Sequence, residues 1–157
     1  MMGVGKSTIG KKLAKKLKRK FVDIDKIIEI NEKKTIKEIF ENKGENYFRK
    51  IEKKITLEEL KKNNLVIALG GGAFMSTSIR KEIKSSCLSF WLDLKVESLL
   101  SRLKNVKKRP LLDQGKLELS INKIYSERKK IYNESHFKIK CNSMYKEIGR
   151  ASCRERV

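Results

Sequence analysis

The first residues of the chain are of types that bind phosphate groups, in the order Gly3-Val-Gly-Lys-Ser-Thr8. Glycines let backbone N–H groups approach phosphate oxygens closely, a lysine neutralises the β- and γ-phosphates, and a serine hydroxyl can ligate Mg²⁺. The run is the second half of the pattern G-x-x-x-x-G-K-[ST]. Ile9, Leu13 and Leu17 follow at intervals of four residues among lysines, which is typical of an amphipathic helix. A phosphate-binding loop at a helix N-terminus therefore explains the run better than a glycine-rich turn without function.

Two aspartates follow the next apolar segment and could serve the same chemistry. Asp23 and Asp25 flank Ile24 at the end of a short predicted strand that begins at Phe21. Transfer of a phosphoryl group needs carboxylates near the metal and near the attacking hydroxyl. The spacing alone fits two solvated loop aspartates equally well, so both interpretations stay open at this point.

Arginine is rare in this chain before its last eleven residues. The arginines outside that segment are Arg19, Arg49, Arg80, Arg102, Arg109 and Arg128. Where lysine is the usual cation, an arginine indicates a need for its planar guanidinium, which can bind a carboxylate or phosphate through two hydrogen bonds. These positions are therefore candidates for binding anionic groups.

The remaining pattern predicts strands that alternate with helices. Strands are predicted at 21–23, 65–69, 88–92 and 137–141, and helices at 35–40, 45–62, 79–84, 96–103 and 117–132. Thr35 and Glu38 form a capping-box pattern, and Gly44 is expected to end the short helix that this pattern begins. Such alternation is typical of an α/β fold, in which helices cover a parallel sheet.

Composition limits the classes of partner. A length of 157 residues fits one domain. The net charge of +20 comes mainly from lysines spread over almost every segment, which favours solvated helix faces over a specific nucleic-acid site. No apolar run approaches the roughly 20 residues of a membrane span, and Cys87, Cys141 and Cys153 lack C-x-x-C spacing. We expect a cytoplasmic protein that binds neither nucleic acid nor membranes.

The two ends of the chain depart from the rest of the pattern. The first glycine of the phosphate-binding pattern would fall one residue before Met1, and the strand from which such a loop extends has no counterpart in the sequence. Residues 147–157 have no hydrophobic period and use arginine where the rest uses lysine. We interpret the chain as truncated at its N-terminus and residues 147–157 as a non-native tail.

Five blocks of residues occur in an order and with a spacing that indicate a family. They are Phe21-Val-Asp-Ile-Asp25 with Ile28-Glu29, Gly44-Glu-Asn-Tyr-Phe-Arg-Lys-Ile-Glu52, Gly70-Gly-Gly72, Arg109-Pro-Leu-Leu112 and Glu127-Arg-Lys-Lys-Ile-Tyr132. Together they resemble the shikimate kinase family, from Gly3 to about Cys141. The resemblance implies a three-layer P-loop kinase fold with a central parallel sheet, whose first strand is missing here, helices on both faces and a mobile lid. Residues 1–146 would form this domain, with a substrate-binding region at about 25–54 and a lid at about 104–116.

The resemblance implies a role for most of the candidate residues. ATP would be bound by Gly3, Val4, Gly5, Lys6, Ser7, Thr8, Arg102 and Arg109. Mg²⁺ would be held by Ser7 and, through water, by Asp23. Shikimate would be bound by Asp25, Arg49, Gly71, Gly72 and Arg128, with Glu52 supporting Arg49. The catalytic residues would be Lys6, Asp25 and Arg109, with Asp25 accepting the proton of the attacking hydroxyl. Arg19 and Arg80 match none of these positions, so we interpret them as ordinary helix-end residues.

The resulting hypothesis is a shikimate kinase, which would transfer the γ-phosphate of MgATP to the 3-hydroxyl of shikimate in the synthesis of chorismate and aromatic amino acids. The family also suggests a monomer. The alternatives are another small-molecule P-loop kinase, of the gluconate or nucleoside-monophosphate type, and a non-catalytic kinase-like binding domain. The chain departs from the family at Lys130, where the family usually has proline, and its adenine loop is not recognisable at 142–146.

Overall fold

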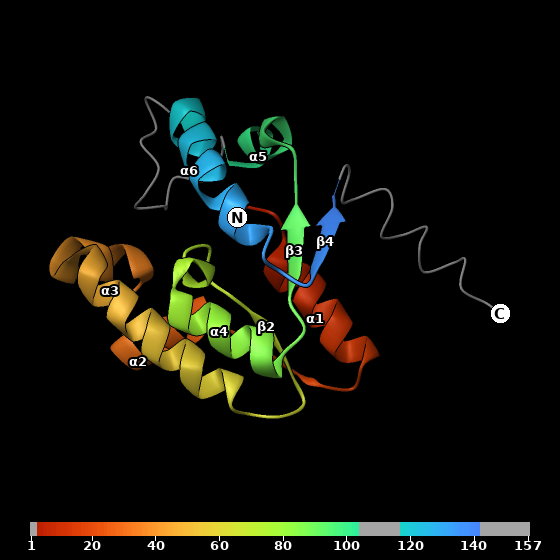
Figure 1. Cartoon of the computed structure of the whole chain (residues 1–157). Helices are drawn as coiled ribbons and strands as arrows, with labels where there is room; N and C mark the ends of the chain where they lie inside the picture. The colour runs from red at the N-terminus through yellow and green to blue at the C-terminus, as the bar shows by residue number, and fades with distance from the viewer. Residues whose placement is uncertain (1–2, 104–116, 142–157) are drawn as a thin grey trace.

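The computed structural model describes residues 3–103 and 117–141 of the chain (Figure 1). Its helices are α1 (Lys6–Lys16), α2 (Ile24–Glu32), α3 (Ile36–Leu60), the 3₁₀ helix η1 (Ala73–Met75), α4 (Thr77–Ser86), α5 (Val96–Leu103) and α6 (Leu117–Tyr132). Its strands are β1 (Lys20–Asp23), β2 (Leu65–Ala68), β3 (Phe90–Asp93) and β4 (Phe137–Lys140). The predicted lid at 104–116 and the predicted tail at 147–157 lie outside the described residues, so these predictions remain untested.

The four strands form two parallel pairs. Strand β1 pairs with β2 from Lys20↔Leu65 to Asp23↔Ala68, and β3 pairs with β4 from Phe90↔Phe137 to Asp93↔Lys140. The predicted alternation of parallel strands and helices is confirmed. In the described residues, however, the expected central sheet takes the form of two separate two-stranded sheets. Since paired parallel strands end at the same edge, Asp23 and the glycine segment Gly70–Gly72 that follows β2 lie close together.

Helix α3 contains both of the helices predicted between residues 35 and 62. Its N-terminus has the predicted capping box, in which the Thr35 hydroxyl accepts a hydrogen bond from Glu38 N and the Glu38 carboxylate accepts one from Thr35 N. Gly44 interrupts the helical backbone with φ of 77° and ψ of 170°, a conformation that favours glycine. The second part of α3, after this kink, carries Arg49 and Glu52, which approach the glycine segment that follows β2.

Helix α2 was missed by the sequence prediction. Ile24 and Ile28, four residues apart, are both fully buried and pack against α3 in one of the two hydrophobic clusters. The i, i+4 spacing of these isoleucines was the available signal, but two apolar residues beside an Asp-x-Asp pattern are a weak one. The consequence for the site is that Asp25 lies in the first turn of a helix.

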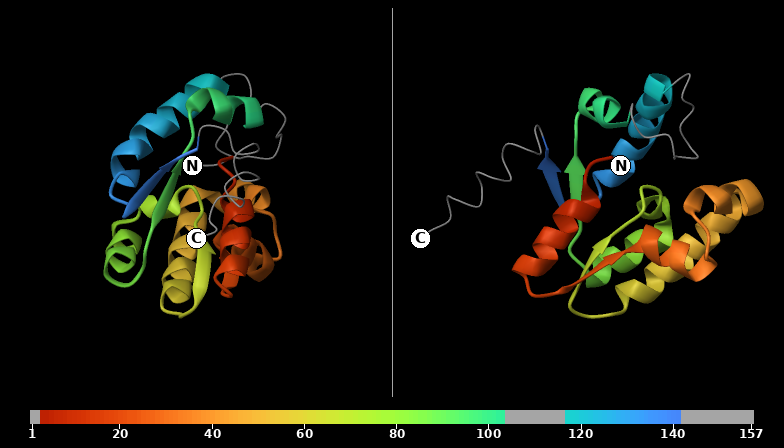
Figure 2. Two further views of the ribbon diagram at one scale, coloured as in Figure 1. Left: turned by 90° about the vertical axis from the view of Figure 1, so that its right-hand side faces the viewer. Right: turned by 180° about the vertical axis from the view of Figure 1, so that it is seen from behind.

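The hydrophobic core consists of two clusters that meet at β2. One cluster joins α2 to α3, and the other joins β3 to α4, α5 and α6. Ile67 and Leu69 pack against both clusters. Figure 2 shows the corresponding arrangement, with α5 and α6 at one end of the molecule and α2, α3 and α4 at the other. The glycine segment that follows β2 therefore begins at the point where the two clusters meet.

None of the helices in the described part of the chain is long and apolar enough to cross a membrane.

The packing predicts different costs for two leucine truncations. Leu99 of α5 is 0% exposed, whereas Leu119 of α6 is 68% exposed. We expect Leu99→Ala to lower the free energy of unfolding by about 2–5 kcal/mol, because it leaves a cavity in the core. We expect Leu119→Ala to change it by less than about 0.5 kcal/mol. Urea denaturation of the two variants checks this, and equal effects would contradict the described packing of α5.

Candidate active site

The phosphate-binding run forms a tight loop directly before α1. Gly3 and Gly5 have φ of 76° and 90°, conformations that glycine adopts without strain, and Val4 between them is buried. Lys6 is the first residue of α1, so the N–H groups of the first helical turn lie next to the loop. Arg102 of α5 donates a hydrogen bond from Nη1 to the carbonyl oxygen of Gly3 at 3.3 Å. The structure thus brings the predicted ATP-binding arginine to the predicted ATP-binding loop.

The two predicted Mg²⁺-binding residues are in direct contact. The hydroxyl of Ser7 donates a hydrogen bond to Oδ2 of Asp23 at 2.6 Å. A hydroxyl and a carboxylate are oxygen donors of the kind that Mg²⁺ takes, usually together with water and substrate phosphates. The described residues contain no cluster of three or more His, Cys, Asp or Glu side chains that could hold a metal by themselves. The Ser7–Asp23 pair supplies two oxygen donors of this kind.

Asp25 and Glu52 approach each other at Gly70. A Cβ atom on Gly70 would lie 2.8 Å from Oδ1 of Asp25 and would overlap the Glu52 carboxylate, so this position has no room for a side chain. Glu52 is only 2% exposed. Burial raises the pKa of Glu52, and the nearby Asp25 charge adds to this, whereas the Arg49 charge opposes it.

Arg49 is held at the other end of the glycine segment, next to Gly72. Its Nη1 donates to Oε2 of Glu52 at 2.6 Å, and its Nε and Nη2 both donate to Oε1 of Glu45. The guanidinium also lies over the Phe48 ring, 5.2 Å from its centroid, and a Cβ on Gly72 would overlap it. About a third of the side chain stays exposed, 30%, so Arg49 is fixed in orientation while remaining accessible to a ligand.

Helix α6 brings Arg128 and Tyr132 to the same segment. These residues are four apart and so lie on one face of the helix. Arg128 Nη1 donates to the carbonyl oxygen of Gly71 at 2.7 Å, and the Tyr132 hydroxyl donates to the same oxygen. Burial raises the pKa of Tyr132, so its hydroxyl keeps its proton at neutral pH and remains a donor.

The position of α6 is set by contacts with β3. The Tyr125 hydroxyl donates to Oδ1 of Asp93 at 2.9 Å, and burial together with this bond raises the pKa of Tyr125 to about 12. Trp91 packs edge-on against Tyr132, with ring centroids 5.8 Å apart. Because β3 and α6 are fixed to each other, Arg128 reaches the glycine segment from a defined direction.

The structure thus gathers the predicted site residues into two neighbouring groups. One group lies at the phosphate loop: Gly3, Val4, Gly5, Lys6, Ser7, Thr8, Asp23 and Arg102. The other surrounds the glycine segment: Asp25, Arg49, Glu52, Gly71, Gly72 and Arg128. Arg109 lies outside the described residues, and its role remains a prediction. Sequence reasoning gave no role to Tyr132, although its position one helical turn after Arg128 was an available signal.

Comparison with known proteins agrees with this geometry. A family model described as "Shikimate kinase" matches residues 2–152. The chain belongs to the shikimate kinase family. The shikimate kinase of Persephonella marina is 43% identical over 88% of this chain and 83% of the relative, and that of a Sulfurihydrogenibium species is 44% identical over 88% and 82%.

Solved structures of the same family share the fold. The shikimate kinase from Acinetobacter baumannii in complex with shikimate superposes with a TM-score of 0.89 at 33% identity, covering 96% of this chain and 86% of that one. The shikimate kinase from Aquifex aeolicus superposes with a TM-score of 0.81 at 35% identity, covering 97% and 89%. The three-layer P-loop kinase fold expected from the sequence is thereby confirmed.

The burial of Glu52 predicts how stability depends on pH in this shikimate kinase family member. Because the folded-state pKa of Glu52 is raised, its contribution to stability is present below its ordinary value of 4.5 and is lost as pH rises through the folded-state pKa. We therefore expect the free energy of unfolding of the wild type, minus that of Glu52→Gln, to fall as pH increases from about 3 to about 7. Urea denaturation across this range measures the difference.

Glu38 supplies a control of opposite sign. Its hydrogen bonds to Thr35 lower its pKa, so its contribution to stability is present above 4.5 and is lost as pH falls through the lowered folded-state pKa. The corresponding difference for Glu38→Gln should rise with pH over the same range. If the difference in unfolding free energy for Glu52→Gln also rose with pH, burial would not be the main influence on the pKa of Glu52.

Proposed function

We propose that the chain transfers the γ-phosphate of ATP to the 3-hydroxyl of shikimate, as a cytoplasmic monomer on the route to chorismate and the aromatic amino acids. The observation that carries this proposal is the convergence of two arginines and an aspartate on the glycine segment Gly70–Gly72. Shikimate combines one carboxylate with several hydroxyls, so it calls for cationic donors at one end and a carboxylate acceptor at the other.

The nucleotide side of the site follows from the phosphate loop. Backbone N–H groups of the loop and the first turn of α1 bind the phosphates, and Lys6 neutralises charge between the β- and γ-phosphates. Ser7 and Asp23 would hold Mg²⁺, Asp23 through water, and this ion supplies further neutralisation of the phosphate charge when it is bound. Arg102 lies at Gly3, where it can stack on the adenine ring.

The acceptor side follows from the glycine segment. Arg49 and Arg128 bind the shikimate carboxylate from two directions, and the backbone of Gly71 and Gly72 contacts the ring hydroxyls. Asp25 binds the hydroxyls and accepts the proton of the 3-hydroxyl as its oxygen bonds to the γ-phosphorus. The bond from that phosphorus to the β–γ bridging oxygen breaks, and ADP leaves with the electron pair. Arg109, on a closing lid, would stabilise the charge of the transferring group and help exclude water.

A substrate panel tests the proposal. The purified protein is supplied with MgATP and, in turn, with shikimate, gluconate and nucleoside monophosphates, and ADP formation is followed by a coupled assay. We expect ADP release to depend on shikimate, with the product identified as 3-phosphoshikimate by ³¹P NMR. Phosphorylation of gluconate or of a nucleoside monophosphate without that of shikimate would contradict the proposal.

Replacement of Arg49 separates binding of the two substrates. We expect Arg49→Ala to raise the KM for shikimate by about 10- to 150-fold, the loss of roughly 1.5–3 kcal/mol for a hydrogen bond to a charged group. The KM for ATP should change by less than about twofold, because Arg49 lies away from the phosphate loop. Arg19→Ala, at an exposed arginine, serves as the control and should change neither constant. A similar rise in both KM values for Arg49→Ala would argue against the assigned role.

A further inference from the structure

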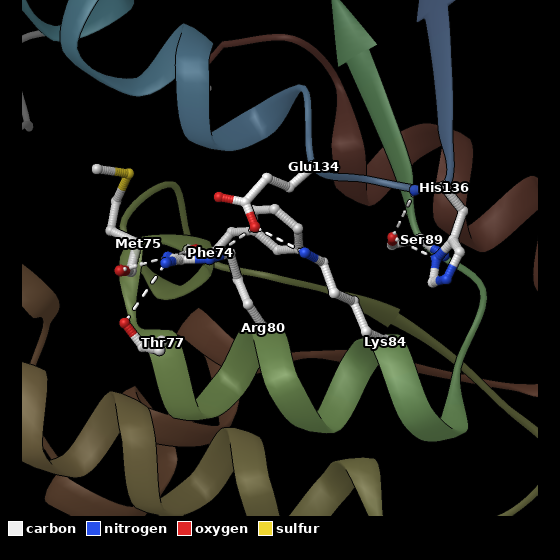
Figure 3. A network of polar contacts seen from close by, with 8 residues as sticks. All are labelled: Phe74, Met75, Thr77, Arg80, Lys84, Ser89, Glu134 and His136. Atoms are coloured by element: carbon white, nitrogen blue, oxygen red, sulfur yellow. Dashed lines mark hydrogen bonds and ion pairs between the residues drawn. The ribbon is translucent and has the colours of Figure 1, made fainter.

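Arg80 has contacts that an ordinary helix-end residue would not need. It lies in the first turn of α4, where a positive charge is unfavourable because the helix N-terminus is itself positive. Yet its side chain is only 14% exposed. Its Nη1 donates to the carbonyl oxygens of Phe74 at 3.0 Å and Met75 at 2.7 Å, and its Nε lies 3.5 Å from Oε2 of Glu134 (Figure 3). The interpretation of Arg80 as an ordinary helix-end residue is therefore wrong.

These contacts join both of the segments that form the acceptor side of the site. Phe74 and Met75 belong to η1, which directly follows the glycine segment. Glu134 lies two residues after Tyr132, whose hydroxyl bonds to Gly71. Arg80 thus links the end of η1 to the turn directly after α6, while Tyr132 and Arg128 link α6 back to the glycine segment. The contacts form a closed circuit around the Gly70–Met75 segment.

Within this circuit, the planar guanidinium performs a task that lysine cannot perform equally well. Its Nη1 bonds to two successive carbonyl oxygens while its Nε, in a fixed position relative to Nη1, forms an ion pair with an opposing carboxylate. Lys84, one turn further along α4, offers the natural comparison. Its Nζ binds the same Glu134 carboxylate at 2.7 Å, but half of its side chain is exposed. Figure 3 shows Arg80 reaching towards η1 and Lys84 reaching only towards Glu134.

We propose that Arg80 is a positioning residue for the shikimate site: it holds η1 against the end of α6, so that Gly71 and Arg128 keep the geometry that binds the acceptor. Arg80 itself contacts no substrate. This inference rests on the function proposed above, because it concerns the acceptor side of the same site. It predicts that a change at Arg80 weakens shikimate binding while leaving nucleotide binding unchanged.

The test compares Arg80→Lys, Arg80→Ala and Glu134→Gln with Lys84→Ala as the matched control. Shikimate affinity is measured by isothermal titration calorimetry, the KM values for shikimate and ATP by steady-state kinetics, and Tm by thermal denaturation. We expect both Arg80 variants to raise the Kd and KM for shikimate by at least about tenfold, since small misplacements of binding groups have effects of this size. The KM for ATP should stay within about twofold for all variants, and Lys84→Ala should leave shikimate binding unchanged.

The outcomes separate a positioning role from a merely structural one. A structural role alone would lower Tm and the fraction of active protein but leave the shikimate KM of the remaining enzyme unchanged, and that result would overturn the inference. Should Arg80→Ala fail to fold, Arg80→Lys and Glu134→Gln decide the question, because each retains part of the circuit. Normal shikimate affinity in both of these variants would also overturn it. A wild-type protein that does not phosphorylate shikimate would instead refute the proposed function.

Discussion

The proposed acceptor side of the site depends on one carbonyl oxygen, that of Gly71. It accepts hydrogen bonds from both Arg128 and Tyr132, which lie on α6, far along the chain. A carbonyl oxygen has two lone pairs, so these two donors use its full capacity and fix the plane of the peptide. Because Gly70 and Gly72 have no room for side chains, Asp25, Glu52 and Arg49 can approach the same peptide closely. Residues from three helices, α2, α3 and α6, thus meet at this backbone segment.

The charged side chains around this segment fix the orientation of Arg49 before any ligand arrives. Arg49 is shared between Glu45, which is exposed, and Glu52, which is buried. Breaking a buried ion pair is costly, so this arrangement restricts the guanidinium to one orientation. A ligand carboxylate then meets an arginine whose conformational entropy has already been lost, which favours binding. The raised pKa of Glu52 reflects the cost of keeping a carboxylate in this position.

Local patterns were sufficient to predict the α/β fold and the phosphate loop, whereas the roles given to the residues around Gly70–Gly72 came from the resemblance to the shikimate kinase family. The phosphate loop needs glycines at fixed spacing, and the capping box at Thr35 and the break at Gly44 are read from neighbouring residues. Two features escaped prediction for different reasons. Helix α2 was missed because two isoleucines four residues apart are a weak signal beside an Asp-x-Asp pattern. Arg80 was misread because its partners, Met75 and Glu134, come together only in the folded chain.

Arg49 and Arg128 together are proposed to bind the carboxylate of the acceptor. Isothermal titration calorimetry with shikimate and with its carboxamide tests this pairing, because the two compounds have nearly the same shape and differ in charge. With about 1.5–3 kcal/mol for each of two charge-assisted contacts, we expect the carboxamide to bind roughly 10²- to 10⁴-fold more weakly. Equal affinity for the two compounds would contradict it.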